Sequence, residues 1–257
     1  MLKKILSTGI FISFCLVMAS CAETPVKKTV SKTEKARMYV EVANGALLEG
    51  DPTGALQSLA SAENEEPNLP EIHHSRALAY YAKKDLKEAL SSARKSVMLK
   101  PDYCEANNTF GKLLMDAGNY DEAIKPLMVA ANDPLCREAF KAQTNLGIIY
   151  YKKLEYEKAM GYLEKAITAA PNVACIAYYY RGHVHIKQSK LSAAIDDYDM
   201  ATRRFCANFG EAHLALGIAY VQAREYGKAR KKFIEIERLY PKTNLANEAI
   251  NHLRYLP

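Results

Sequence analysis

Residues 140–171 read FKAQTNLGIIYYKKLEYEKAMGYLEKAITAAP and contain two consecutive amphipathic helical patterns. In the first, Leu146 and Tyr150 share a helix face at the i, i+4 spacing, and in the second Ala159 and Leu163 do the same. The closing proline prevents continuation of the second helix. The stretch therefore predicts a helical hairpin in which each helix has one apolar face.

The same arrangement recurs six times along the 257 residues, with successive copies 34 to 36 residues apart. Each copy has a small residue, an Ala twelve positions later and usually a Pro after another twelve. This period is typical of a solenoid, in which each unit buries its apolar face only by stacking on its neighbours. A solenoid offers extended surface instead of a closed pocket, so the pattern favours a binding protein. The small residues are Ala43, Ala77, Gly111, Gly147, Gly182 and Gly217, and the matching alanines are Ala55, Ala89, Ala123, Ala159, Ala194 and Ala229.

Four of these small residues are glycines in the interior of a predicted helix. Gly at such a position destabilises a helix by up to about 1 kcal/mol relative to Ala. Four glycines at one register therefore indicate a packing requirement. We expect the two helices of a hairpin to approach closely there, with the Ala of the second helix docked against the Gly of the first.

This spacing, with a small residue at position 8, Ala at 20 and Pro at 32, resembles the tetratricopeptide repeat. The chain has no Trp, which the family often carries at position 4. The resemblance covers residues 36–241 and implies an all-α fold, a right-handed superhelical solenoid of six helix-turn-helix repeats. Residues 242–257 are expected to form a capping helix whose apolar residues cover the last repeat. The matching residues are Tyr39, Ala43, Ala55, Leu59, Ala62 and Pro67 in the first unit, and Leu216, Gly217, Tyr220, Tyr226, Ala229, Phe233 and Pro241 in the last.

The first twenty residues have the features of a secretory signal peptide: two lysines, an apolar run of about 14 residues that is too short for a stable membrane span, and a small pair. The segment Val-Met-Ala-Ser-Cys ending at Cys21 resembles a bacterial lipobox, in which the Cys becomes the acylated N-terminus. The alternative is ordinary cleavage with an unmodified Cys21. In lipoproteins that this chain resembles, Asp directly after the lipidated Cys would argue against the outer membrane. This chain has Ala22 there instead, which implies an outer-membrane lipoprotein facing the periplasm. Residues 21–35 are expected to be the lipidated Cys and a flexible tether.

Four cysteines remain after the signal peptide and Cys21 are set aside, and they fall into two pairs separated by 32 and 31 residues. In a helical hairpin, the start of the first helix and the residues after the second lie at the same end. Disulfides are therefore plausible in an oxidising periplasm, whereas four buried free thiols are the alternative, and sequence alone leaves three connectivities open. The candidate pairs are Cys104–Cys136 and Cys175–Cys206.

In tetratricopeptide superhelices, positions 2, 5, 9, 12 and 13 of each first helix line the concave groove. Here the resemblance gives an apolar and aromatic surface with a few cations, which suits an extended peptide or an amphipathic segment. We further hypothesise that much of the partner contact is supplied by the apolar residues nearest the lipid, Val40, Leu47, Leu48, Leu78 and Tyr81. The predicted groove residues are Val40, Asn44, Leu47, Leu48, His74, Leu78, Tyr81, Asn108, Lys112, Met115, Ile148, Tyr151, Tyr179 and His183.

No nucleophile elbow, phosphate-binding loop or dinucleotide motif occurs, and no His or Cys group has metal-ligand spacing. The formal charge of +6 includes two signal-peptide lysines, and charges of both signs alternate along the helices, unlike a nucleic-acid surface. Asp196, Asp197 and Asp199 are interpreted as a solvated acidic face. We therefore expect no enzyme, cofactor, metal, nucleic acid or small-molecule substrate, but a protein partner.

A lipobox, a short tether and six repeats together resemble the type IV pilus biogenesis lipoproteins, the pilotins of the PilF, PilW and Tgl type. The resemblance implies an outer-membrane adaptor that binds secretin subunits and promotes their localisation and multimerisation. The alternative is another periplasm-facing repeat lipoprotein, such as an adaptor that recruits peptidoglycan enzymes. Repeat architecture does not separate the two, because fold does not determine function.

Overall fold

Helices of similar length follow one another along the chain, and residues 30–257, which this computed structural model describes, contain no strand. The predicted signal peptide, Cys21 and most of the predicted tether lie outside these residues. The helices are α1 (Lys32–Leu48), α2 (Pro52–Glu65), α3 (Pro70–Ala82), α4 (Leu86–Leu99), α5 (Cys104–Asp116), α6 (Tyr120–Asn132), α7 (Ala139–Lys152), α8 (Tyr156–Ala169), α9 (Cys175–Lys187), α10 (Leu191–Met200), α11 (Gly210–Gln222), α12 (Tyr226–Leu239) and α13 (Asn244–Arg254), with a short 3₁₀ helix, η1 (Arg204–Cys206), before α11.

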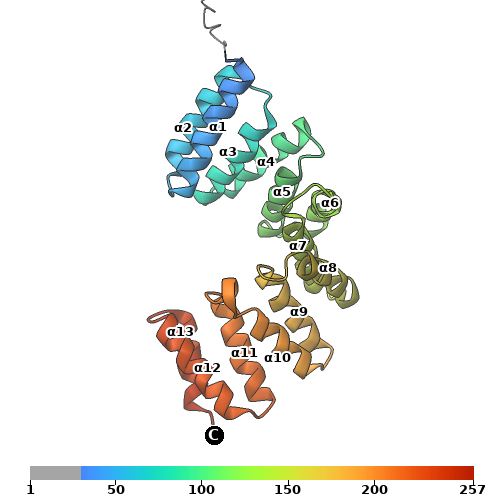
Figure 1. The fold of residues 1–257 in the computed structure, drawn as a ribbon, viewed down its shortest axis with the longest axis vertical. Coiled ribbons are helices and arrows are strands. Elements are labelled where there is room, and N and C mark those ends of the chain that lie inside the picture. The colour runs from blue at the N-terminus through green and yellow to red at the C-terminus, as the bar shows by residue number, and fades with distance from the viewer. Residues whose placement is uncertain (1–29) are drawn as a thin grey trace, which may run out of the picture. The chain divides into compact units, whose positions relative to one another are not determined.

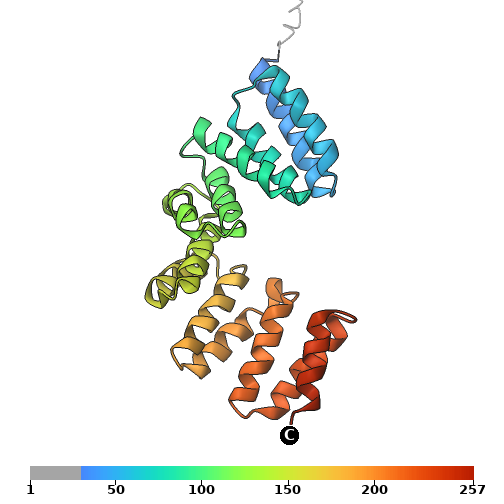
Figure 2. The ribbon, with the colours of Figure 1, turned by 180° about the vertical axis from the view of Figure 1, so that it is seen from behind.

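Consecutive helices pair into six hairpins, α1–α2 to α11–α12, which we number repeats 1 to 6 (Figures 1 and 2). Each hairpin packs on the next, and the first helices of neighbouring repeats also contact each other, as α5 does with α7 and α7 with α9. The described part of the chain is thus the all-α solenoid that the sequence predicts. Its core is a series of clusters along the row of repeats.

Helix α1 begins earlier than predicted, since Lys32–Lys35 were assigned to the tether but belong to the helix. Two side chains of this first turn reach the end of α2. Thr33 Oγ1 donates to Glu66 Oε2 at 3.4 Å, and Lys35 forms an ion pair with Glu65. These contacts stabilise a helical first turn whose polar sequence does not by itself predict a helix.

The glycines of repeats 3 to 6 allow close packing, but the residue that packs on them is not the expected alanine. A Cβ at Gly111, Gly147, Gly182 or Gly217 would lie 2.4–2.6 Å from a side-chain atom of the residue sixteen positions later. The alanine twelve positions later is buried beside this contact. The glycine therefore accommodates a large apolar side chain of the second helix. These side chains are Leu127, Leu163, Tyr198 and Phe233.

Buried polar side chains replace the Trp that the family often has at position 4. Asn107 Nδ2 donates to the carbonyl of Pro101 at 2.8 Å. His73 Nε2 and His213 Nε2 bond the carbonyls of Pro67 (3.1 Å) and Ala207 (2.8 Å). Each contact spans six residues and ties the start of a repeat to the loop before it. These bonds satisfy buried groups that would otherwise destabilise the fold.

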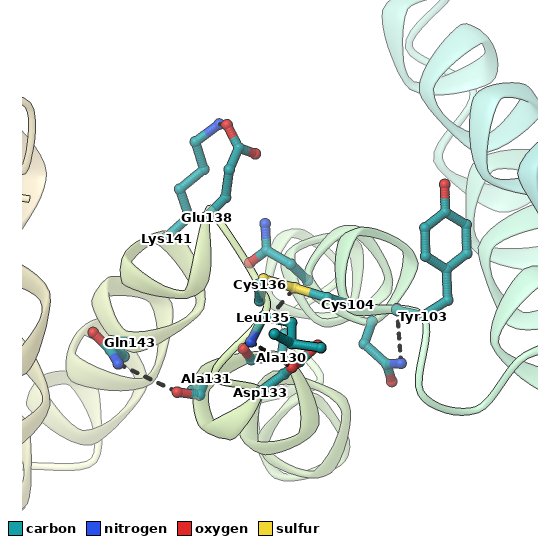
Figure 3. Close-up of a disulfide and its surroundings, with 12 residues drawn as sticks. Tyr103, Cys104, Ala130, Ala131, Asp133, Leu135, Cys136, Glu138, Lys141 and Gln143 are labelled. Carbon is teal, nitrogen blue, oxygen red and sulfur yellow. Dashed lines mark hydrogen bonds and ion pairs between the residues drawn. A yellow bond between two sulfur atoms is a disulfide. The ribbon is translucent and has the colours of Figure 1, made fainter. Parts of the chain in front are cut away.

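Two disulfides hold the ends of repeats 3 and 5. Cys104, the first residue of α5, is bonded to Cys136 in the loop after α6, with 5.9 Å between the Cα atoms (Figure 3). Cys175, the first residue of α9, is bonded to Cys206 in η1, with 5.4 Å between the Cα atoms. The structure thus joins the two pairs that hairpin geometry makes plausible.

The predicted acidic face of α10 is only partly solvated, because Asp197 is 4% exposed. Its carboxylate accepts hydrogen bonds from Arg181 Nε at 2.9 Å and Arg181 Nη2 at 2.6 Å. His185 Nε2 lies 3.6 Å from the same carboxylate, and burial lowers the pKa of this histidine. The prediction was wrong for Asp197, since Arg181 of α9 faces it across the hairpin and satisfies a charge that the pattern of α10 alone suggested was solvated.

Helix α13 covers the apolar end of repeat 6. Ala249 belongs to the same cluster as Phe233, with Leu245 and Leu253 packed against it. The ring of His252 stacks on Phe233 with 4.9 Å between centroids. This helix removes the apolar face of repeat 6 from water.

Candidate partner-binding groove

The first helices of repeats 3 to 6 line three adjoining hollows of about 410, 570 and 260 Å³. The first is lined by α5, α7 and the start of α9, the second spans α5 to the start of α11, and the third lies between α9 and α11. Lys112, Asn145 and Ile176 line both the first and the second hollow, and Tyr179 and Glu211 line both the second and the third. The hollows therefore form one continuous surface, which we call the C-terminal groove.

An aromatic cluster around His183 forms one wall of this groove. The Tyr179 ring lies 4.3 Å from the His183 ring, centroid to centroid, and Tyr198 Oη lies 2.7 Å from His183 Nδ1. Tyr151 and Tyr180 contact the same imidazole at 5.9 Å. The helical spacing of these residues on α7 and α9, with one contribution from α10, brings five rings together.

Burial within this cluster shifts the pKa values of its side chains. Loss of water, with Lys187 nearby, lowers the pKa of His183 to about 4. Burial, and then the neighbouring Tyr180, raise the pKa of Tyr179 to about 12, and burial also raises the pKa of Tyr198. All three side chains are therefore neutral at pH 7. The wall is apolar and aromatic, with hydroxyls that can orient a bound segment.

Charged side chains border the groove but are largely neutralised. Lys112 Nζ lies 2.5 Å from Asp116 Oδ1, and Tyr81 donates to Asp116 Oδ2 at 2.9 Å. Lys152 Nζ lies 5.6 Å from the centroid of the Tyr120 ring, within reach of a cation–π attraction. This arrangement does not resemble a basic nucleic-acid surface. It resembles the polar rim of a protein interface around an apolar centre.

Six of the fourteen predicted groove residues line the C-terminal groove, and Tyr151 borders it through its ring contacts. Met115 and Ile148 are mainly core residues that expose only an edge to it. The six are Asn108, Lys112, Met115, Ile148, Tyr179 and His183.

The predicted residues of repeats 1 and 2 do not form a comparable surface. Val40 is 6% exposed and packs in the core of repeat 1, so it is unavailable to a partner. Asn44 accepts a hydrogen bond from Ser75 at 2.7 Å. Leu47 is half-buried against the same core, whereas Leu48 is fully exposed at the end of α1. The hypothesis of one apolar contact patch here is corrected at Val40, since α3 packs over it.

Repeat 2 is similarly filled. His74 Nε2 bonds Thr109 Oγ1 at 3.0 Å, its ring packs edge-on against Tyr103 at 5.3 Å, and burial lowers its pKa to about 4. Leu78 is half-buried. Tyr81 is exposed, but the hollow that it lines lies at the turn between α3 and α4. The neighbouring repeat thus occupies the space that a partner would need.

Several groove residues were not predicted. Position 2 of the repeat is occupied by Lys141, Ile176 and Glu211. The rule that positions 2, 5, 9, 12 and 13 line the groove includes this position and therefore predicts all three. Asn145 and Tyr180 occupy position 6, one helical step from the expected positions. Phe209 precedes α11 in a loop, where helical periodicity gives no signal.

Two other kinds of feature, a metal-binding cluster and a membrane-spanning helix, are absent from the described residues. Within residues 30–257, no three His, Cys, Asp or Glu side chains come together where they could hold a metal ion. Among the thirteen α-helices, none has the length and apolar character needed to cross a bilayer. The C-terminal groove is therefore the candidate functional site.

Stacked helical hairpins with an aromatic concave surface define a helical-repeat binding scaffold. Family models described as "Tetratricopeptide repeat" match residues 70–103, 108–174 and 179–242. The chain belongs to the tetratricopeptide-repeat family. The matched models describe repeat scaffolds and indicate no catalytic family.

Two proteins whose names refer to type IV pili, PilF and PilW, resemble the chain over most of its length. It is 23% identical over 224 residues to the type IV pilus assembly protein PilF of Pseudomonas aeruginosa, covering 85% of this chain and 86% of PilF. A solved structure of Pseudomonas aeruginosa PilF superposes with a TM-score of 0.74 at 20% identity, covering 86% of this chain and 99% of that one. The crystal structure of PilW, a type IV pilus biogenesis factor, gives 0.73 at 18% identity over 84% and 98% of the two chains. At these identities, the two structures establish the shared fold.

Proposed function

We propose that this protein is an outer-membrane lipoprotein adaptor, a pilotin, that binds secretin subunits and promotes their outer-membrane localisation and multimerisation for type IV pilus biogenesis. The observation that carries the proposal is similarity to PilF along nearly the whole of both chains. A match restricted to a few repeats would reflect only the common repeat pattern. Coverage of 85% of this chain and 86% of PilF supports a shared role.

The proposed mechanism is physical. Acylation of Cys21 anchors the adaptor, since two or more acyl chains give stable membrane attachment. The C-terminal groove holds a secretin segment, and tethering raises the local concentration of subunits where they assemble. The tyrosine hydroxyls and aromatic rings of the groove suit an extended or amphipathic segment. No bond is made or broken.

A pair of matched variants tests the groove. Ile176 of α9 lines two hollows of the groove and is 48% exposed, while Ile234 of α12 is 52% exposed and lines none of them. We expect Ile176→Asp to reduce secretin multimers in outer-membrane fractions strongly, since it places a charge in the apolar contact. Ile234→Asp should leave the multimers at wild-type level. Equal multimers in both variants would remove the groove from the mechanism.

Lipidation has its own test. Metabolic labelling with a palmitate analogue should mark the wild-type protein and leave Cys21→Ser unlabelled. Cys21→Ser should also leave the outer-membrane fraction and reduce secretin multimers there.

Normal multimers in a strain lacking the protein, with altered cell-wall hydrolysis instead, would favour the peptidoglycan-enzyme adaptor.

A further inference from the structure

Two exposed apolar side chains occupy equivalent places in the two disulfide loops. Leu135 directly precedes Cys136 and is 88% exposed, and Phe205 directly precedes Cys206 and is 78% exposed. The loop of the intervening repeat exposes Val173. All three lie between the second helix of one repeat and the first helix of the next. They therefore share one edge of the solenoid, which we call the disulfide edge.

The disulfide edge is held in place. The Cys136 amide donates to the carbonyl of Asp133 at 3.1 Å, and the Leu135 amide donates to Asp133 Oδ1 at 2.9 Å (Figure 3). In the second loop, the Cys206 amide donates to the carbonyl of Arg203 at 2.9 Å. Because the adjacent Cys is bonded back to the first residue of the first helix of the same repeat, neither loop can easily fold its apolar side chain back onto the surface. Two apolar side chains are therefore held exposed at equivalent places in two loops.

Cations accompany the apolar side chains. Arg137 follows Cys136 and Arg204 precedes Phe205, and within residues 30–257 no carboxylate lies within ion-pair distance of either guanidinium. Arg204 Nη1 donates to Asn172 Oδ1 at 3.3 Å, and both line a hollow of about 170 Å³ with Arg203. Arg204 also has a φ of 52°, an uncommon backbone conformation outside glycine. The hollow is large enough for a carboxylate and places a free positive charge beside it.

We propose that the disulfide edge is a second contact surface, which receives an acidic amphipathic segment of the same protein partner that occupies the C-terminal groove. The inference rests on the function proposed above. Val173 lines a hollow of the groove as well as belonging to the edge, so the two surfaces are continuous. A bound chain can leave the groove over Val173, place apolar side chains on Leu135 and Phe205, and set a carboxylate on Arg204.

The charges favour a protein over a lipid surface. Asp133 lies two residues before Leu135, so an anionic membrane surface would be repelled there, whereas a peptide can carry its carboxylate at Arg204 and only apolar side chains beside Leu135. Two or three separated side chains also offer less apolar area than one acyl chain, which by itself gives only marginal membrane binding. The apolar side chains of an acidic amphipathic segment would pack on Leu135 and Phe205, and its carboxylate would pair with Arg204.

The absence of Trp from the chain provides a clean reporter. Leu135→Trp and Phe205→Trp each introduce a single indole, and Leu154→Trp is the control, because Leu154 is 70% exposed at the opposite end of a hairpin, in the turn between α7 and α8. The full acylated proteins are titrated with purified secretin subunit from the same organism. We expect a blue shift of emission at 135 and 205 and none at 154.

Affinity provides the second readout. Leu135→Ser, Phe205→Ser and Arg204→Gln should each weaken secretin binding about tenfold, and Leu154→Ser should not change it. Thermal unfolding checks that the exposed substitutions leave the fold intact. Wild-type-like binding by all three edge variants would overturn this inference and leave the proposed function standing.

The remaining outcomes are also decisive. A blue shift at 205 produced by phosphatidylethanolamine–phosphatidylglycerol vesicles without secretin, with quenching by brominated lipid, would assign the edge to the membrane and overturn the inference. No binding of secretin by the wild-type protein would overturn the proposed function and the inference together.

Discussion

Repeats 1 and 2 differ from repeats 3 to 6 although one sequence period builds both. In the first two, Val40 is core and His74 bonds Thr109 of the next repeat, while Leu48 and Tyr81 are exposed without lining any hollow of the C-terminal groove. In the last four, Tyr179 and His183 stand beside open hollows. Both disulfides and all four register glycines also lie in the last four repeats. The repeat pattern therefore specifies the stacking, while the side chains at a few positions decide which part of the concave face can receive a partner.

The largest expected effect concerns the buried ion pair of repeat 5. Asp197→Ala would leave Arg181 partly buried without its carboxylate, and removing one partner of such a pair destabilises by about 3–5 kcal/mol. Hydrogen exchange should show the loss in α9 and α10, with α1–α4 unaffected. The double variant Asp197→Leu/Arg181→Met should recover much of the stability. Equal loss of protection at both ends would contradict the separation of the two regions.

Removal of the second disulfide should have the next largest effect. Cys175→Ser/Cys206→Ser opens a loop of 31 residues, so the free energy of unfolding should fall by roughly 2–4 kcal/mol. Urea denaturation followed by circular dichroism measures it. Reductant should reproduce the loss in the wild-type protein and have no further effect through this bond in the variant. Unchanged stability would show that the loop is held by its packing alone.

Repeats 2 and 4 differ at the small position by a single methyl group. Repeat 2 carries Ala77, whose neighbour sixteen residues later is the small Ala93, whereas Gly147 faces Leu163. Gly147→Ala should destabilise by about 1–3 kcal/mol through overpacking. Gly161→Ala, in the open interior of α8, should stabilise by roughly 0.4–1 kcal/mol. Thermal unfolding of the pair gives opposite shifts, and two shifts of the same sign would contradict this packing.

The last expected effect is a pH dependence present in both regions. The pKa of His74 and that of His183 are both lowered to about 4 in the fold, from an ordinary 6.5. The unfolded chain thus binds more protons between these values, so stability is full above about 6.5 and falls as the pH decreases toward 4. His183→Phe should flatten part of this decline in urea midpoints measured from pH 7 to 4. An unchanged slope would show that His183 is solvated in the native protein.

Periodicity was sufficient to predict the helical hairpins, their number and the solenoid class, because every repeat must bury its faces against similar neighbours. It was insufficient for contacts that depend on a facing helix. Asp197 looked solvated because Arg181 lies on another element, and Val40 looked accessible because α3, which covers it, is a repeat away. Ile176 and Glu211 followed the position rule, whereas Phe209 is in a loop that no period describes.

The central claim is that a secretin segment lies in the C-terminal groove and not on the first two repeats. Photo-crosslinking is the direct measurement, with a benzophenone side chain at Ile176 or at Leu48, both exposed positions of first helices, in cells that assemble the secretin. The account predicts a secretin crosslink at 176 and none at 48. Crosslinking at 48 with none at 176 would contradict it.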